Sequence, residues 1–255
     1  LSKLRKERGY HVEESNGHLL FTGNPGTGKT EIARLYTEIL YEHGLIAENK
    51  IVEVGRADLI GEYVGQTAPK IKTVFDSASG GVLFIDEAYS LIPQSERDFA
   101  NEAIPTIIQE MENRRNEIVV IFAGYKDLMH NFIDTNPGLQ SRISKIIHFE
   151  DYSVDELYEI FRMMLSKKDY SIESSCEKVL RSHFSKVGTT EHFGNGRYVR
   201  KLIEASFYQQ ATRVMEKTGN RTLEEKEMNV VIEADIKNAI QELSELEWFE
   251  RKYCV

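Results

Sequence analysis

Eight residues near the start of the chain have the composition of a phosphate-binding loop. Residues 23–30 read Gly-Asn-Pro-Gly-Thr-Gly-Lys-Thr, the pattern G-x-x-x-x-G-K-T in which x is any residue. Glycines let the backbone turn so tightly that several N–H groups can converge on one phosphate. Lys29 can reach the β- and γ-phosphates, and the Thr30 hydroxyl can ligate Mg²⁺. The pattern predicts a nucleoside triphosphate site contacted by Asn24, Pro25, Gly26, Thr27, Gly28, Lys29 and Thr30.

The segments on either side of this loop have the strand–loop–helix order that such a site requires. A short apolar run, His18–Phe21, precedes the loop, and the helical pattern of Glu31–Tyr36 follows it. The positive end of the helix dipole would add attraction for an anion. The alternative is a glycine-rich turn before an ordinary helix, and residue frequencies give the motif by chance in roughly one chain in a hundred. The flanking segments favour the nucleotide site.

Two adjacent carboxylates, Asp86 and Glu87, follow the apolar run Val82–Ile85. In an open α/β sheet, ligands bind outside the carboxyl ends of the strands. We expect Asp86 to hold Mg²⁺ or its water shell and Glu87 to act as the general base on the attacking water. The alternative is a strand that ends in two solvated acids, which taken alone is the commoner explanation. Downstream of a phosphate loop, the pair favours hydrolysis over nucleotide switching or nucleotide kinase activity.

A third candidate feature is the loop Leu59–Gln66, whose glycines permit mobility. Tyr63 and Val64 lie between those glycines and offer ring and alkyl surface that can pack on any polypeptide backbone. The alternative is a Tyr63 buried in its own domain, which is the usual place for an aromatic residue. In the company of a nucleotide site, we expect Tyr63 and Val64 to grip a protein substrate.

The spacing of apolar runs predicts the fold. Strand-like runs at 18–21, 51–54, 82–85, 118–122 and 146–149 alternate with helical patterns near 29–43, 67–79, 96–113 and 126–133. This alternation predicts an α/β fold of the P-loop NTPase type, with a five-stranded parallel sheet flanked by helices.

The pattern changes after Phe149. Capping boxes beginning at Ser153 and Ser174 open two helices, and the only candidate strand beyond them is 229–232. Helices are predicted near 153–167, 174–187, 195–217 and 234–250. We therefore place the nucleotide-binding domain at residues 1–150 and a small C-terminal helical lid domain, with an extension, at 151–255.

Composition is that of a globular enzyme from a reducing compartment. The 255 residues are 41% hydrophobic and 29% charged, with only two cysteines, Cys176 and Cys254, and no metal-ligand spacing. No apolar run approaches the ~20 residues that span a bilayer, and no signal peptide opens the chain. We expect a cytoplasmic protein with free thiols, no membrane insertion and no metal other than Mg²⁺. The net charge of −9 disfavours nucleic acid as a partner.

The order of these motifs is similar to that of AAA+ ATPases. Besides the features above, the chain contains Asn136–Arg142 and Gly194–Arg197 in the expected order. Within AAA+ proteins it resembles the CbbX-like group, which includes the red-type Rubisco activases, the stage V sporulation protein K group and the ATPase domain of type VII secretion EccA proteins. Matching stretches such as Thr67–Lys70 and Gly80–Tyr89 extend the resemblance over nearly the whole chain.

The resemblance implies a role for each matching residue. Arg142 matches the arginine that one subunit inserts into its neighbour's site, where it stabilises charge on the transferred phosphoryl group. Arg197 matches the second sensor arginine, which closes the lid onto the γ-phosphate. Tyr63 matches the pore-loop aromatic that pulls substrate through the channel of a hexameric ring. For either arginine, the alternative is a surface ion pair.

Two positions depart from the family pattern. Tyr125 stands where many AAA+ proteins have a polar first-sensor asparagine, so the identity of the first sensor stays open. The chain begins at Leu1, which the resemblance places inside the helix before the first strand. The resemblance therefore implies a truncated N-terminus that lacks the segment contacting the nucleotide base.

Together these features predict an AAA+ ATP hydrolase that forms a homo-oligomeric ring, a hexamer, and uses ATP and Mg²⁺ to remodel a client protein. The expected catalytic residues are Lys29, Asp86, Glu87, Arg142 and Arg197. One alternative is a nucleotide-gated binding module with negligible turnover. Another is a DNA-linked ATPase of the clamp-loader type, which the acidic charge and the Tyr63 loop disfavour. The residues do not identify the client.

Overall fold

The computed structural model describes residues 17–93, 95, 98–190, 192–218 and 228–253. The chain divides into two compact units. The first comprises Leu1–Gly23 and Gly28–Phe149, and the second comprises Asn24–Thr27 and Glu150–Val255. Residues 24–27 of the phosphate loop thus group with the C-terminal unit, although they are flanked in the chain by the first.

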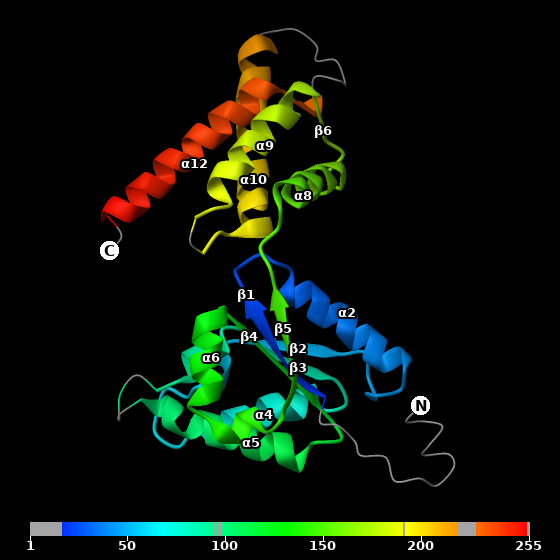
Figure 1. Cartoon of the computed structure of the whole chain (residues 1–255), viewed down its shortest axis with the longest axis vertical. Coiled ribbons are helices and arrows are strands. Elements are labelled where there is room, and N and C mark those ends of the chain that lie inside the picture. The colour runs from blue at the N-terminus through cyan, green and yellow to red at the C-terminus, as the bar shows by residue number, and fades with distance from the viewer. Residues whose placement is uncertain (1–16, 94, 96–97, 191, 219–227, 254–255) are drawn as a thin grey trace. The chain divides into compact units, whose positions relative to one another are not determined.

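The first unit is built on a parallel sheet, in which the described residues form five strands in the order β2-β3-β4-β1-β5 (Figure 1). The strands are β1 (His18–Gly23), β2 (Ile51–Val54), β3 (Val82–Ile85), β4 (Val119–Gly124) and β5 (Ile143–Phe149). The predicted five-stranded parallel sheet is confirmed. Strands β1, β3 and β4 read as continuous apolar runs because they are interior strands whose two faces are both covered.

Helices cover both faces of this sheet (Figure 1). Successive residues of a strand point to opposite faces, so Leu19 and Phe21 pack with helix α2 while Leu20 packs in the cluster on the other side. The helices of the unit are α2 (Lys29–Glu42), α3 (Arg56–Leu59), α4 (Thr67–Ala78), α5 (Ala103–Asn113), α6 (Lys126–Asp134) and α7 (Pro137–Gln140), with 3₁₀ turns η1 (Ala88–Leu91) and η2 (Phe99–Glu102).

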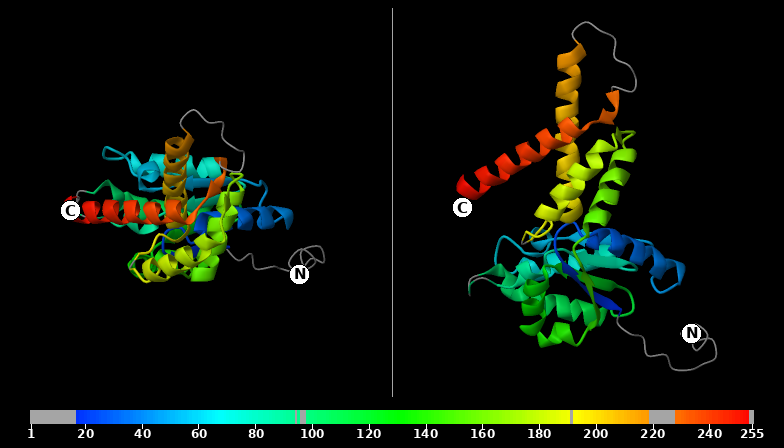
Figure 2. Two further views of the ribbon diagram at one scale, coloured as in Figure 1. Left: turned by 90° about the horizontal axis from the view of Figure 1, so that it is seen from above. Right: turned by 45° about the horizontal axis from the view of Figure 1, so that its top comes forward.

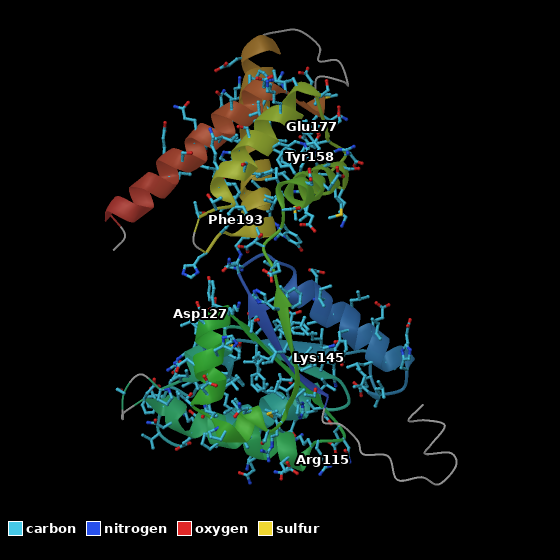
Figure 3. All side chains as sticks on the ribbon, viewed as in Figure 1. Arg115, Asp127, Lys145, Tyr158, Glu177 and Phe193 are labelled. Carbon is cyan, nitrogen blue, oxygen red and sulfur yellow. The ribbon has the colours of Figure 1, made fainter. Side chains whose placement is uncertain are left out.

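The structure corrects two of the expected elements in this unit. The helix predicted near 96–113 begins as the 3₁₀ turn η2, which the Asp98 carboxylate caps by accepting a hydrogen bond from the Ala100 N–H, and becomes α-helical only at Ala103. The strand predicted at 146–149 begins earlier, at Ile143. It is an edge strand with partly exposed side chains such as Lys145, so its first half lacks a continuous apolar signal (Figure 3).

The second unit is mainly helical (Figure 2). Its elements are α8 (Val154–Ser166), β6 (Ser171–Ile172), α9 (Ser175–Val187), α10 (Asn195–Thr218), β7 (Val230–Val231) and α12 (Glu233–Tyr253). Phe161, Phe184 and Leu202 are fully buried in a core of their own. The candidate strand at 229–232 is present as β7, and its partner β6 was missed because two residues carry no periodicity.

Side chains join helices α8 and α9 at their exposed edge. The Arg181 guanidinium lies 4.6 Å from the centre of the Tyr158 ring and pairs with Glu177, and Figure 3 labels Tyr158 and Glu177 on these two helices. Cys176 is free and buried, and burial raises the pKa of its thiol to about 11, so it stays protonated at neutral pH. Cys254 lies outside the described residues. No helix in the described part of the chain has the length and apolarity to cross a bilayer.

Of the two capping boxes predicted from the sequence, the structure contains one. Ser153 accepts a hydrogen bond from the Glu156 N–H at 3.3 Å, and the Glu156 carboxylate accepts one from the Ser153 N–H at 2.8 Å. The Ser153 N–H and hydroxyl both donate to the Glu156 carboxylate and lower its pKa. The box predicted at Ser174 is wrong, because Ser174 is helical and its side chain caps nothing. There the carboxylate of Glu177 accepts a hydrogen bond from Arg181 instead.

Because Ser153 caps its helix and Ser174 does not, substituting each serine by alanine gives a matched test of the cap. Ser153→Ala should lower the free energy of unfolding of the second unit by about 1 kcal/mol, the usual loss for an N-cap. Ser174→Ala should change it by no more than a few tenths, since no cap is lost. Denaturant unfolding followed by circular dichroism measures both. Equal losses in the two variants would contradict the observed caps.

Candidate functional site

The phosphate loop leaves β1 through a glycine that no other residue could replace. Gly23 has φ 148°, and a Cβ there would lie 2.3 Å from the carbonyl oxygen of Phe149. Helix α2 then begins after Gly28, which is left-handed at φ 91° and contributes no side-chain cap. The first N–H groups of this 14-residue helix are therefore left for an external acceptor. Lys29 extends back over the loop, where its Nζ donates to the Gly23 carbonyl at 2.8 Å.

The tip of the loop is equally crowded. Gly26 has φ 72°, and a Cβ on it would lie 2.3 Å from the Gly194 carbonyl oxygen and 2.6 Å from the Arg197 nitrogen. These residues belong to the second unit, as Gly26 does. The backbone of Arg197, the expected second sensor, therefore approaches the loop directly.

The two acids lie at the carboxyl edge of the sheet, as expected for residues that follow β3. Both are exposed, and the Glu87 N–H donates to Asp86 Oδ1 at 3.0 Å. Glu87 is left-handed, with φ 49° and ψ 43°. A non-glycine residue in this region is strained by about 1–3 kcal/mol, and such strain concentrates at functional sites. The turn holds both carboxylates at the end of the strand, with Glu87 in solvent.

Tyr89 is the residue at this edge that the sequence did not single out. Burial raises its pKa to about 12, and the nearby Glu87, Tyr125 and Asp86 add to the rise. Its ring centre lies 5.9 Å from that of Tyr125, which caps helix α6 after β4. Tyr89 is therefore a neutral hydroxyl beside the acidic pair at physiological pH. Tyr125, at the expected first-sensor position, therefore has a second tyrosine ring beside it.

Arg142 lies at the opposite edge of the sheet. It precedes β5, whose first residue, Ile143, pairs with His18 at the amino end of β1. Its guanidinium pairs with Glu112 at 2.9 Å and donates to the Gly138 carbonyl at 2.9 Å. Burial, together with the Arg142 charge, lowers the pKa of the adjacent His18 to about 4. Within the chain, Arg142 therefore forms the ion pair that was its alternative interpretation, at the edge remote from the phosphate loop.

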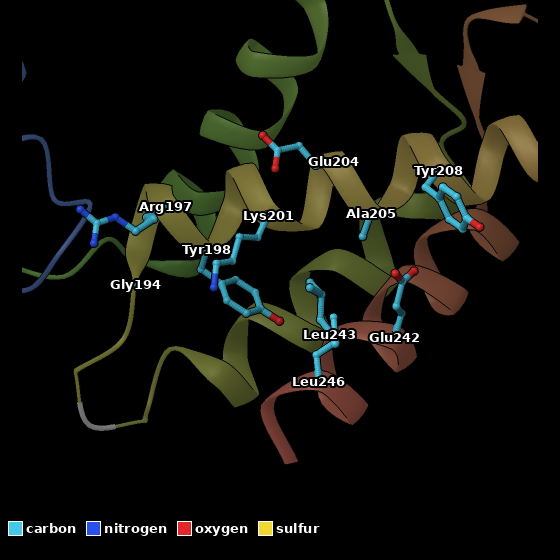
Figure 4. A pocket seen from close by; sticks show the side chains of 10 residues that line it. All are labelled: Gly194, Arg197, Tyr198, Lys201, Glu204, Ala205, Tyr208, Glu242, Leu243 and Leu246. Atoms are coloured by element: carbon cyan, nitrogen blue, oxygen red, sulfur yellow. The ribbon is translucent and has the colours of Figure 1, made fainter. Parts of the chain in front are cut away.

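Arg197 behaves differently. It is exposed near the start of α10 and forms no ion pair among the described residues. Figure 4 shows it at one end of a groove of about 580 Å³ along α10 and α12. Lys201 and Tyr198 follow it along α10, and Leu243 and Leu246 line the side formed by α12.

Tyr63 and Val64 are exposed, at 67% and 84% of their surface. The loop that carries them is fixed at its base, where the buried Thr67 hydroxyl accepts from the Gly61 N–H and donates to the Phe99 carbonyl. Gly65, at φ 79°, turns the chain beyond the tip. The alternative that Tyr63 is buried in its own domain is wrong.

The donor set fits a nucleotide and a magnesium ion. The N–H groups of Gly26 and Gly28 donate no hydrogen bond among the described residues, and glycines with positive φ leave room for a phosphate beside them. Thr30 and Asp86 offer the hydroxyl and carboxylate oxygens that Mg²⁺ prefers. They follow β1 and β3 at the same edge of the sheet.

A parallel sheet with a phosphate loop after one strand and an acidic pair after another, joined to a helical unit, defines a P-loop nucleoside triphosphatase with a lid. Residues 19–151 match the model of the ATPase family associated with various cellular activities (AAA), and residues 153–245 match the AAA lid domain. The chain belongs to the AAA family. It is a nucleotide-binding, ATP-hydrolysing enzyme.

Known relatives confirm the resemblance to the CbbX-like group. The chain is 43% identical to the chloroplastic ribulose bisphosphate carboxylase/oxygenase activase of Cyanidioschyzon merolae, over 87% of this chain and 76% of that protein. It is 42% identical to stage V sporulation protein K of Bacillus subtilis, over 84% and 68% respectively. The crystal structure of the FIGL-1 AAA domain shares the fold, with a TM-score of 0.61 and 17% identity over 98% of this chain and 82% of that one.

The acidic pair predicts a separation of binding from turnover. Glu87→Gln removes the base but keeps the shape of the side chain, so ATP affinity should hold while hydrolysis falls roughly 10²- to 10⁴-fold. Asp86→Asn should instead weaken the Mg²⁺-dependent part of binding. Phosphate release and titration with a fluorescent ATP analogue measure the two effects. Persistent hydrolysis in Glu87→Gln would contradict the base role, and a wild type with negligible, Glu87-independent turnover would favour the binding-module alternative.

Proposed function

We propose that this chain assembles into a homo-oligomeric ring, a hexamer, in which hydrolysis of Mg-ATP drives the remodelling of a client protein. Residues 1–150 act as the nucleotide-binding domain and residues 151–255 as the lid. The observation that carries the proposal is the position of Arg142 at the amino edge of the sheet, away from the nucleotide site of its own chain.

Strand geometry gives the size of this separation. Arg142 sits beside the first residue of β1, and the phosphate loop leaves β1 at its last, Gly23. The five steps between the six residues of β1, at about 3.3 Å each, separate the two ends by roughly 17 Å along the strand. An arginine that stabilises phosphoryl transfer must touch the phosphate. Arg142 can therefore serve only the site of a neighbouring subunit, and a ring supplies one such neighbour to every site.

The residues at the carboxyl edge of the sheet then have separate roles in the reaction. Lys29 and the loop N–H groups bind the phosphates, and Thr30 and Asp86 hold Mg²⁺, which would neutralise phosphate charge. Glu87 orients and deprotonates the attacking water. Arg197, near the start of α10, would recognise phosphate charge. It is exposed and has no ion pair within the described ranges of the chain, which leaves its guanidinium available for bidentate recognition.

The exposed loop tip supplies the contact with the client. Tyr63 and Val64 offer an aromatic ring and an alkyl group on a base that Thr67 holds in place. Such a tip can grip any extended polypeptide because it packs on the backbone rather than reading side chains. We propose that these tips thread the client through the centre of the ring.

The client is a protein, and the two named relatives point to different processes at nearly equal identity, 43% and 42%. A Rubisco-type enzyme is one candidate and a sporulation factor another. A DNA-linked role is disfavoured by the net charge of −9.

Sharing of sites between subunits can be tested by mixing. ATPase activity of the wild type should rise with protein concentration and saturate as rings form. Arg142→Ala mixed into wild type should reduce activity more than in proportion to its fraction, since each variant subunit disables its neighbour. Arg115→Ala, which removes another arginine paired with Glu112, is the control and should only dilute. Proportional loss with Arg142→Ala would argue for a self-contained site.

The threading role predicts a loss of remodelling without a loss of chemistry. Tyr63→Ala should keep ATPase activity within about twofold, because the tyrosine touches no catalytic group, and should abolish ATP-dependent release or unfolding of the client. Tyr208→Ala is a control of equal exposure, 66% against 67%, on the lid. Ribulose bisphosphate carboxylase/oxygenase is the first client to assay, because one relative is named as its activase. Unimpaired remodelling by Tyr63→Ala would remove this residue from the substrate path.

A further inference from the structure

Residues 24–27 of the phosphate loop, which group with the second unit, each form a hydrogen bond to other residues of that unit. Asn24 Nδ2 donates to both carboxylate oxygens of Asp151, at 3.0 and 2.9 Å. The Gly26 carbonyl accepts from the Gly196 N–H at 3.1 Å, and the Thr27 carbonyl accepts from the Tyr152 hydroxyl at 3.1 Å. These contacts come from two segments, 151–152 and 194–196, which lie on either side of helices α8 and α9 in the chain.

Asn195 joins the two segments. Its side chain is completely buried, and its Nδ2 donates to Asp151 Oδ1 at 2.6 Å and to the Phe193 carbonyl at 3.0 Å. A third contact, at 3.4 Å, reaches the Pro25 carbonyl. Its Oδ1 accepts from the Tyr152 N–H at 2.9 Å. Both polar atoms of the amide are thus used, and Asn195 adopts a left-handed φ of 45° to use them.

Peptide geometry links these contacts to phosphate binding. In a planar trans peptide the C=O of one residue and the N–H of the next point in opposite directions. Holding the carbonyls of Pro25, Gly26 and Thr27 on one side therefore turns the N–H groups of residues 26–28 to the other. The N–H groups of Gly26 and Gly28 have no partner among the described residues. The loop is therefore held with its N–H groups facing away from these contacts and available to an anion.

We propose that Asn195 and Asp151 are positioning residues that hold the phosphate loop in its binding conformation. They contact the loop itself, so they act by keeping its N–H groups ordered before the phosphates arrive, which spares binding the entropy of ordering them. Asn195 is also the first residue of α10, so the same amide fixes the start of the helix that carries Arg197. The inference rests on the proposed nucleotide site and adds to it two residues outside the phosphate-loop motif.

The test is nucleotide affinity in the full chain, measured with fluorescent ATP and by displacement with tripolyphosphate, which probes the phosphate contacts alone. Asn195→Ala should weaken both ligands by the same factor, roughly tenfold or more, as expected when buried hydrogen bonds are lost. Turnover at saturating ATP should fall much less, so the effect appears in KM more than in kcat.

Asp151 is exposed, so its substitution should leave the fold intact. Two variants of this residue remove its hydrogen-bond acceptors to different extents. Asp151→Ala removes the acceptor for both Asn24 and Asn195 and should weaken binding in the same way. Asp151→Asn keeps one acceptor oxygen and should recover part of the affinity. If Asn195→Ala fails to fold, this pair carries the test by itself.

The matched control is Gln210→Ala on the same helix. Gln210 is also a buried amide, at 3% exposure, and donates to the Met228 carbonyl far from the loop in the chain. It should lower thermal stability and leave both affinities unchanged. Equal affinity losses in Gln210→Ala and Asn195→Ala, or wild-type affinity in a folded Asn195→Ala and in Asp151→Ala, would overturn the positioning role. A wild type that binds neither ATP nor tripolyphosphate would overturn the nucleotide site as well.

Discussion

The parallel pairing of the five strands is the constraint on which the candidate site depends. Because every strand runs in the same direction, residues that follow β1, β3 and β4 all emerge at one edge, although they are far apart in the sequence. Lys29, Asp86, Glu87 and Tyr125 meet there for this reason. The residue that precedes β5, Arg142, emerges at the opposite edge by the same rule. One topological fact thus both gathers a hydrolytic centre and separates it from the arginine that would complete it.

Burial makes this arrangement firm. The strands β1, β3 and β4 bury apolar side chains on both faces of the sheet. A shift of one residue in register would move every side chain of a strand from the core on one face to the core on the other. The polar groups that leave the sheet are therefore fixed in position by the apolar residues before them. A firmly packed sheet can hold a strained residue at the end of a strand. Glu87, in its left-handed conformation, is an example.

The polar side chains of Arg142 and Asn195 are held with different strength. Arg142 is paired with Glu112, but about a fifth of its side chain is exposed and so is about half of Glu112, so water can replace either partner at small cost. Its Nε is buried without a partner among the described residues, which leaves the pairing incomplete. Under the proposed assembly into a ring, an arginine held in this way would exchange its carboxylate partner for the phosphate of a neighbouring subunit. By contrast, the amide of Asn195 is wholly buried and fully bonded, as a fixed support requires.

Local patterns in the sequence determined the elements and the chemical types of the site residues. The phosphate loop, the acids after an apolar run and the capping box at Ser153 are each written in a few consecutive residues, so their interactions can be predicted from spacing. The equal pattern at Ser174 failed because the chain there is already helical and Arg181 takes the glutamate. Only the tertiary structure decided that Tyr89 lies against the acids, that Arg142 pairs with Glu112, and that Asp151 and Asn195 hold the loop. Apart from the Tyr89 contact, these contacts join residues 30 or more positions apart. They depend on how each unit folds back on itself, which no local spacing encodes.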